Sequence, residues 1–336
     1  MKKDLCLVYN NPDPSAGGIP RYAYRIIEGL KDEEVEFSEI DFSELERGRA
    51  VDKILNLVHR RRRFIFNNQD QLGDINHFLQ PELYFPTDGT DIVTVHDLFM
   101  KTYWDPNSFY EKVQKRIYSR RVDRCIEHAD ILIAVSEQTK QTLIDSGARE
   151  SDIKVINSGI RDKFDLKRKY RSREKKIGYI GDFRPRKRVE RLLKEFEDIN
   201  IDYSLSVAGY GGPNEDSLKE KYSSNPGITF EDRIPEEDLV DWYNSLRAFF
   251  FPTELEGFGL PVLEATACGT PVFVYEDAKI SEEIRKYCYT VGNLEKVPGI
   301  LEGIREEELE EKSEKVKEEF SWDQTVEETI GVYDER

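Results

Sequence analysis

The chain has 336 residues and a formal net charge of −17, with 38% hydrophobic and 11% aromatic residues. This length suggests about two domains, and the apolar content is typical of a globular protein rather than a disordered one. The strong negative charge argues against nucleic acid as a partner, because a phosphate backbone requires a basic surface.

The sequence predicts a cytoplasmic protein. No apolar run approaches the roughly 20 residues that a membrane span needs. The N-terminal segment turns polar at Asn10, before a signal-peptide core is complete. The four cysteines form no C-x-x-C pair, which predicts reduced and mostly buried thiols. They are Cys6, Cys125, Cys268 and Cys288.

In the first half, short apolar runs alternate with amphipathic stretches, a pattern typical of parallel strands covered by helices. A strand is predicted at 5–9, and the pair Gly17 and Gly18 precedes a helix with one apolar face. Ser136 fits the N-cap of a helix that ends before Gly147. Further strands are predicted at 35–40, 63–66, 92–95 and 131–135.

The second half repeats this rhythm, with predicted strands at 177–180, 203–208, 228–230, 248–251 and 271–275. Between the halves, residues 161–190 hold 13 Lys or Arg against 5 Asp or Glu. This basic island is either a solvated face or a site for a small polyanion such as a diphosphate. A charged helix at 306–319, most simply a solvated face, leads into Phe320 and Trp322, whose apolar bulk predicts that the tail docks on the folded body.

The predicted fold class is therefore α/β, with two Rossmann-like domains. The first would comprise residues 1–165 together with the tail 320–336, and the second residues 166–319. Domains of this kind bind ligands at the carboxyl ends of their parallel strands.

The strongest functional signal is a strand–loop–helix segment at 251–265. Gly257 and Gly259 allow its backbone to approach a ligand, and N–H groups at the helix start suit an anion or a sugar hydroxyl. Glu256 lies in the loop and Glu264 one turn into the helix, so both can face one crevice. One carboxylate would hold a transferred sugar, and the other would accept hydrogen bonds from ribose hydroxyls.

The motif Glu256-Gly-Phe-Gly-Leu-Pro-Val-Leu-Glu264 resembles the signature of the retaining glycosyltransferases of family 4, which adopt the GT-B fold. Other segments resemble that family in the same order, so the resemblance covers nearly the whole chain. These segments are 17–21, 95–98, 129–137, 155–160, 178–181, 208–212 and 320–322. It implies two domains facing each other across a cleft, with the C-terminal helix returning to the first, and transfer of a hexose from a nucleoside diphosphate sugar.

The resemblance implies roles for matching positions in the second domain. Glu264 would bind the donor ribose. Glu256 would bind the donor sugar, together with the backbone of Phe258, Gly259 and Leu260. The donor is not specified further, since GDP-mannose and UDP-hexoses both fit.

The remaining implied roles concern the diphosphate and the reacting sugar. Lys187, helped by Arg186, would neutralise the diphosphate, and Gly17 and Gly18 would let the first domain approach it. His96 would lie beside the reacting sugar and is grouped with Glu256 as catalytic, although a histidine at a strand end is often only a core or cap residue. It is not assigned as the general base, because the departing phosphate could take the acceptor's proton.

One position departs from the family pattern. Many members carry an arginine directly after the glycine that corresponds to Gly181, and here Asp182 stands there. Arg184 is a candidate replacement, which leaves the exact cationic pair open.

Absent motifs narrow the chemistry. No Asp-x-Asp pair occurs, so no metal site is predicted, and cationic side chains would take its place; no cofactor is expected either. No Gly-x-Gly-x-x-Gly and no P-loop is present, which disfavours a dinucleotide dehydrogenase or a P-loop enzyme.

Basic residues in the first half bear on the acceptor, which could be a glycan, a lipid-linked molecule or a small molecule. Cations at 59–63 and along a predicted helix give either a solvated face or a surface for anionic lipid at the inner membrane face. Those on the helix are Lys112, Lys115, Arg116, Arg120 and Arg121. The alternatives to a transferase are a nucleotide-sugar epimerase or phosphorylase of similar fold, and a nucleotide-sugar-binding protein without catalysis.

Overall fold

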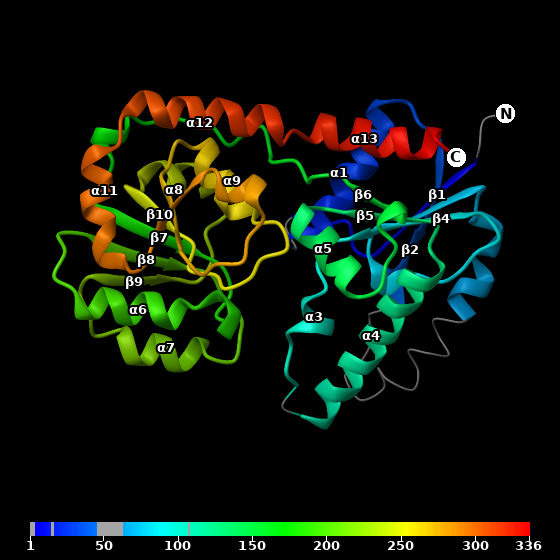
Figure 1. Cartoon of the computed structure of the whole chain (residues 1–336), viewed down its shortest axis with the longest axis horizontal. Coiled ribbons are helices and arrows are strands. Elements are labelled where there is room, and N and C mark those ends of the chain that lie inside the picture. Colours follow the sequence, from blue (N-terminus) through cyan, green and yellow to red (C-terminus); the bar gives the residue numbers. More distant parts are fainter. Residues whose placement is uncertain (1–3, 15–16, 46–62, 107) are drawn as a thin grey trace. The chain divides into compact units, whose positions relative to one another are not determined.

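A computed structural model of the chain describes residues 4–14, 17–45, 63–106 and 108–336. Its contacts divide the chain into unit 1, of Met1–Ser158 and Trp322–Arg336, and unit 2, of Gly159–Ser321. Each unit holds a parallel six-stranded sheet with helices against it (Figure 1). The predicted α/β fold class is confirmed. The units divide after residues 158 and 321, whereas the sequence analysis placed the divisions after 165 and 319.

The sheet of unit 1 has the order β2-β1-β3-β4-β5-β6. Its strands are β1 (Leu5–Tyr9), β2 (Phe37–Asp41), β3 (Ile75–Phe78), β4 (Thr90–Val95), β5 (Ile131–Ala134) and β6 (Ile153–Val155). The unit also contains the helices α1 (Gly18–Asp32), α3 (Phe99–Thr102), α4 (Phe109–His128), α5 (Glu137–Asp145) and α13 (Trp322–Asp334). The order reverses between β1 and β3, the kind of point at which α/β sheets open a crevice for ligands.

The sheet of unit 2 has the order β12-β11-β10-β7-β8-β9, which reverses between β7 and β10. Its strands are β7 (Lys176–Ile180), β8 (Ser204–Ala208), β9 (Ile228–Glu231), β10 (Ala248–Phe250), β11 (Val272–Tyr275) and β12 (Cys288–Val291). In Figure 1, α6 (Val189–Asp198) and α7 (Glu215–Tyr222) cover one face, and α8 (Leu239–Ser245), α9 (Leu260–Ala267) and α12 (Glu306–Glu319) lie on the other. The unit further contains α10 (Glu282–Arg285) and α11 (Val297–Gly303).

The charged helix α12 is not simply a solvated face. Leu309 and Val316 are buried, and the hydroxyl of Ser313 donates a hydrogen bond to the carbonyl of Ala267 at 2.6 Å. Because α12 packs on α9 in this way, it supports the helix that carries Glu264.

The strand predicted at 63–66 is wrong, because residues 63–67 are helical. The strand between β1 and β4 is instead β3, which is not predicted from the sequence. β3 contains Asn76 and His77, both fully buried. β3 is hard to predict because two of its four residues are polar, which breaks the apolar pattern of a buried strand. The segment 63–66 is predicted wrongly because a short apolar run does not distinguish a helix from a strand.

His77 belongs to a buried polar network in unit 1. Its Nδ1 lies 2.6 Å from the Tyr333 hydroxyl of α13, and its Nε2 lies 2.8 Å from the Thr94 hydroxyl of β4. Burial, with a smaller contribution from His96, lowers the pKa of His77 from 6.5 to about 3. The imidazole is therefore neutral in the folded protein and joins α13 to the sheet through hydrogen bonds and an edge-to-face contact with the Tyr333 ring, without an ion pair.

This pKa shift predicts a pH-dependent stability. Below pH 6.5 His77 is protonated in the unfolded chain, whereas in the folded chain it stays neutral down to about pH 3. The free energy of unfolding should therefore fall by about 1.4 kcal/mol per pH unit on account of this residue as the pH falls through that window. We expect His77→Asn to be less stable at pH 7 but to lose about 2 kcal/mol less than the wild type between pH 6.5 and pH 5. Urea denaturation at both pH values measures this, and equal losses in the two proteins would contradict it.

Candidate active site

Two loops leave the sheet of unit 2 at its reversal point. β7 leads to the turn Pro185–Lys187 (η6), and β10 leads to the loop 251–259 that precedes α9. Because β7 and β10 are parallel neighbours, both loops leave from the carboxyl edge of the sheet. Arg186 and Lys187, which belong to the basic island 161–190, therefore lie beside Glu256.

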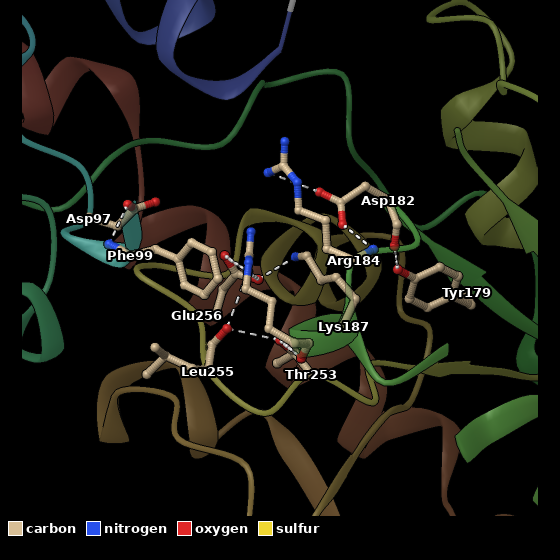
Figure 2. A network of polar contacts seen from close by, with 10 residues as sticks. Asp97, Phe99, Tyr179, Asp182, Arg184, Lys187, Thr253, Leu255 and Glu256 are labelled. Atoms are coloured by element: carbon tan, nitrogen blue, oxygen red, sulfur yellow. Dashed lines mark hydrogen bonds and ion pairs between the residues drawn. The ribbon is translucent and has the colours of Figure 1, made fainter. Parts of the chain in front are cut away.

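Glu256 forms an ion cluster with two cations at this edge (Figure 2). Its carboxylate accepts a hydrogen bond from Nζ of Lys187, and Nη1 of Arg186 lies 3.4 and 3.3 Å from its two oxygens. All three side chains are at most 16% exposed. Nζ of Lys187 also lies 5.1 Å from the centre of the Phe251 ring, within cation–π range.

The charge state of Glu256 follows from these neighbours. Burial by itself would raise the pKa of the Glu256 carboxyl, but the charges of Lys187 and Arg186, together with their hydrogen bonds, outweigh burial and lower the pKa below 4.5. The carboxylate is therefore ionised at neutral pH. Two formal positive charges face one negative charge, so the cluster suits an additional anion.

Backbone hydrogen bonds fix the Glu256 loop against η6 and the segment after β11. The Glu254 N–H donates to the carbonyl of Arg186 at 2.7 Å. The Glu256 N–H donates to the carbonyl of Lys279 at 3.1 Å, and the Lys279 N–H donates to Glu254 at 2.6 Å. The Thr253 hydroxyl donates to the carbonyl of Leu255 at 3.0 Å. The cluster therefore lies on a loop that backbone hydrogen bonds connect to both neighbouring segments.

The start of α9 has the geometry that the sequence predicted. Gly259 is the N-cap residue with φ 107°, a left-handed conformation that favours glycine, and Pro261 lies in the first turn. The Phe258 ring is buried and contacts Phe320 with ring centres 5.8 Å apart. Phe258, Gly259 and Leu260 thus form the tight turn that begins α9. The role of their backbone in binding the donor sugar stays a prediction.

Glu264 lies inside unit 2 with only 6% of its surface exposed. One carboxylate oxygen is 3.4 Å from Nη2 of Arg161, and the other accepts a hydrogen bond from the Tyr243 hydroxyl at 3.2 Å. Arg161 is equally buried, pairs also with Glu236, and stacks on Phe164 at 4.7 Å. The two motif glutamates therefore contact different partners. Neither Arg161 nor Tyr243 is predicted as a partner of Glu264 from the sequence, in which Arg161 is only the first cation of the basic island.

Asp182, where the sequence departs from the family pattern, contacts Arg184 and Tyr179. The Asp182 carboxylate accepts the backbone N–H of Arg184 at 3.0 Å and lies 3.5 Å from its guanidinium (Figure 2). The Tyr179 hydroxyl donates to the Asp182 carbonyl at 2.6 Å. The Arg184 side chain is 57% exposed. Arg184 is thus adjacent to the turn of Arg186 and Lys187, but its charge is shared with Asp182.

In unit 1, the predicted residues follow strands at the carboxyl edge of the sheet. Gly17 is the N-cap of α1 with φ 130°, and Gly18 is the first residue of that helix. His96 follows β4, and its Nε2 lies 3.0 Å from the carbonyl of Leu79, which follows β3. A carbonyl only accepts, so Nε2 carries the proton, and burial lowers the pKa of His96. In the neutral ring Nδ1 is then a hydrogen-bond acceptor.

Two further properties concern the described residues only. No group of three or more His, Cys, Asp or Glu side chains suited to a metal ion occurs among them. No helix among them is long and apolar enough to cross a membrane. The basic residues 59–62 lie outside the described part of the chain.

Comparison with known families agrees with this geometry. Residues 161–318 match the family described as glycosyl transferases group 1, and residues 16–164 match glycosyltransferase family 4. Together the two matches cover nearly the whole chain. The chain belongs to these glycosyltransferases, with the two-domain α/β fold called GT-B.

Several curated relatives match parts of the chain. O-antigen chain mannosyltransferase B of Escherichia coli is 38% identical over 101 residues, which is 28% of this chain and 26% of that protein. The capsular polysaccharide biosynthesis glycosyltransferase CapM of Staphylococcus aureus is 27% identical over 255 residues, 69% of this chain and 62% of that protein. O-antigen chain mannosyltransferase B and a second mannosyltransferase of Escherichia coli are matched over 26% and 14% of their own length.

Solved structures match nearly the whole chain. Sucrose-phosphate synthase from Thermosynechococcus elongatus has a TM-score of 0.78 at 17% identity, covering 99% of this chain and 98% of that chain. HepE of Anabaena, solved in complex with UDP-glucose, has a TM-score of 0.68 at 13% identity, covering 98% and 100%. At these identities the likeness shows the fold.

Proposed function

We propose that the protein transfers a hexose, with retention of anomeric configuration, from a nucleoside diphosphate sugar to a hydroxyl of a glycan, lipid-linked or small-molecule acceptor. The observation that carries this proposal is the cluster of Arg186, Lys187 and Glu256 at the reversal point of the unit 2 sheet. Its excess positive charge suits the diphosphate, and the carboxylate suits sugar hydroxyls. Mannose is the first hexose to test, since relatives are named as mannosyltransferases.

In the proposed reaction, the acceptor oxygen bonds to the anomeric carbon while the bond from that carbon to the phosphate oxygen breaks. The electron pair leaves with the nucleoside diphosphate, whose oxygen takes the acceptor's proton. Lys187 and Arg186 would stabilise the negative charge that develops on the leaving group without a metal ion. Glu264 would bind the ribose, the glycines 17 and 18 would lie near the diphosphate, and neutral His96 would accept a hydrogen bond from a sugar hydroxyl.

A ligand screen tests this function directly. UDP, GDP, UDP-glucose and GDP-mannose should be compared for their effect on the melting temperature, because a ligand at a hundred times its Kd stabilises the folded state by about 2.7 kcal/mol. We expect one base to stabilise the protein and the matching sugar nucleotide to support transfer when acceptors are added. Absence of stabilisation by every nucleotide would contradict the proposal.

The helix α4 provides support for the further proposal of a peripheral membrane contact. Four cations spaced four residues apart are exposed along it, and none forms an ion pair within the described residues: Lys112, Arg116, Arg120 and Arg124. Phe109, the first residue of α4, is 84% exposed, and Tyr103, which directly follows α3, is 50% exposed. Cations beside exposed aromatic rings suit the interface of an anionic bilayer.

The structure changes the set of residues expected at that surface. Lys115 donates a hydrogen bond to the carbonyl of Trp104. Burial lowers the pKa of Arg121 although Glu82 counteracts it, so the guanidinium does not face open solvent. Arg124, which the sequence analysis did not include, takes their place on the exposed face.

Vesicle binding tests this contact. In low salt, we expect the protein to sediment with vesicles of phosphatidylcholine and phosphatidylglycerol. The variant Arg116→Glu with Arg120→Glu should bind at least roughly thirtyfold more weakly, since the two lost cations alone remove about 2 kcal/mol and the new carboxylates repel anionic lipid. The matched control is Arg149→Glu with Lys154→Glu, elsewhere in unit 1. Equal binding of both variants, or no sedimentation of the wild type, would remove the membrane from the proposal.

A further inference from the structure

The cations that the proposed function assigns to the diphosphate already contact a carboxylate. Lys187 donates to Oε2 of Glu256, and Nη1 of Arg186 lies within 3.4 Å of both carboxylate oxygens. Nζ of Lys187 has three N–H donors, so a phosphate can bind it beside Glu256. A diphosphate there shares the charge of both cations with the Glu256 carboxylate and is repelled by that carboxylate.

Repulsion between Glu256 and a phosphate is strong because of where the carboxylate lies. Its side chain is 15% exposed, so water screens the two negative groups poorly. The loop is also held in place, since the Glu254 and Glu256 N–H groups donate to Arg186 and Lys279. The carboxylate consequently stays near the cations, and new hydrogen-bond donors are needed to offset its repulsion of a phosphate.

A sugar nucleotide supplies those donors within the same ligand. The sugar of a nucleoside diphosphate sugar carries hydroxyls beside its phosphate, and these can donate to a carboxylate. A bare nucleoside diphosphate ends at the phosphate and brings no hydroxyl that would offset its repulsion by Glu256.

We propose that Glu256 discriminates between the sugar-bearing donor and the nucleoside diphosphate product by competing with the diphosphate for Lys187 and Arg186. Glu256 thus acts as a specificity-determining residue that weakens product binding and favours product release. The inference rests on the proposed function, because it requires Lys187 to contact the diphosphate.

Neighbouring residues provide a matched control. Glu254 lies in the same loop and is 48% exposed; its carboxylate lies 3.4 Å from Arg188. Arg188 in turn forms 2.8 Å hydrogen bonds with Asp277. A Glu254→Gln variant therefore removes the same charge two residues away without touching the pair of Glu256 and Lys187.

The test is isothermal titration of the wild type, Glu256→Gln and Glu254→Gln with UDP, GDP, UDP-glucose and GDP-mannose. Glu256→Gln should bind the preferred nucleoside diphosphate roughly tenfold more tightly than the wild type. Its affinity for the corresponding sugar nucleotide should change much less, so that the preference for the donor over the product falls. Glu254→Gln should lie within about twofold of the wild type for both ligands.

The outcomes separate this inference from the proposed function. If Glu256→Gln leaves diphosphate affinity unchanged or weakens it, while Lys187→Met weakens it, the inference is overturned and the proposed function stands. If Glu256→Gln raises the affinities for the diphosphate and for the sugar nucleotide equally, Glu256 competes with the diphosphate but does not discriminate between donor and product. The inference is then overturned. If the wild type binds none of the four ligands, both fail together.

Discussion

Replacing Lys187 with methionine is expected to lower the turnover of sugar transfer by about 10²–10³-fold, the usual effect of removing one preorganised group that stabilises developing charge. Methionine keeps an unbranched apolar stem against the Phe251 ring, which Lys187 Nζ now approaches at 5.1 Å. Glu256 keeps Arg186 as a partner at 3.3 Å. The variant should therefore fold, and the loss should fall on catalysis and on diphosphate affinity.

The measurement is release of nucleoside diphosphate in the presence of acceptor, together with the melting temperature of each protein. Lys279→Met is the matched control, because Lys279 is exposed and its backbone, rather than its side chain, contacts the Glu256 loop. The control should transfer sugar at close to the wild-type rate. Turnover of Lys187→Met within a few-fold of the wild type would exclude Lys187 from the reaction.

Much of the fold could be predicted because several of its strands are continuous apolar runs. β5 and β11 are buried at every position and were recognised from the sequence. β3 was missed because Asn76 and His77 are polar and yet fully buried. The Asn76 side chain forms hydrogen bonds of at most 3.0 Å with Gly73 and Thr87. No local pattern in the sequence predicts these partners.

The candidate site divides in the same way. Glu256, Arg186 and Lys187 were predicted from motifs, and the structure brings them into contact because β7 and β10 are adjacent, as strand order in a doubly wound sheet requires. The direct contact of Glu256 with Lys187 could not be predicted, since it depends on distances across 69 positions of sequence. The ion pair of Arg161 and Glu264 joins residues 103 positions apart. It could not be predicted because the sequence does not show that both side chains are buried.

Arg161 gives the second large expected effect, on stability rather than turnover. Arg161→Met leaves the Glu264 carboxylate buried without its cation, and breaking a buried ion pair from one side costs about 3–5 kcal/mol. Glu236, the other partner of Arg161, is 39% exposed and keeps Lys163 at 3.3 Å, so it contributes little to this loss. The free energy of unfolding of unit 2 should therefore fall mainly because of Glu264.

A double-mutant cycle assigns the loss. Glu264→Gln alone should cost less than Arg161→Met, because Arg161 keeps Glu236 and its stacking on Phe164, and the amide can still accept from Tyr243. Adding Glu264→Gln to Arg161→Met should restore at least about 1–2 kcal/mol, since the buried charge is then removed. Urea denaturation of the four proteins measures the coupling. If the double variant is less stable than Arg161→Met by the full cost of Glu264→Gln, the two side chains do not stabilise each other, and Arg161 supports unit 2 through packing alone.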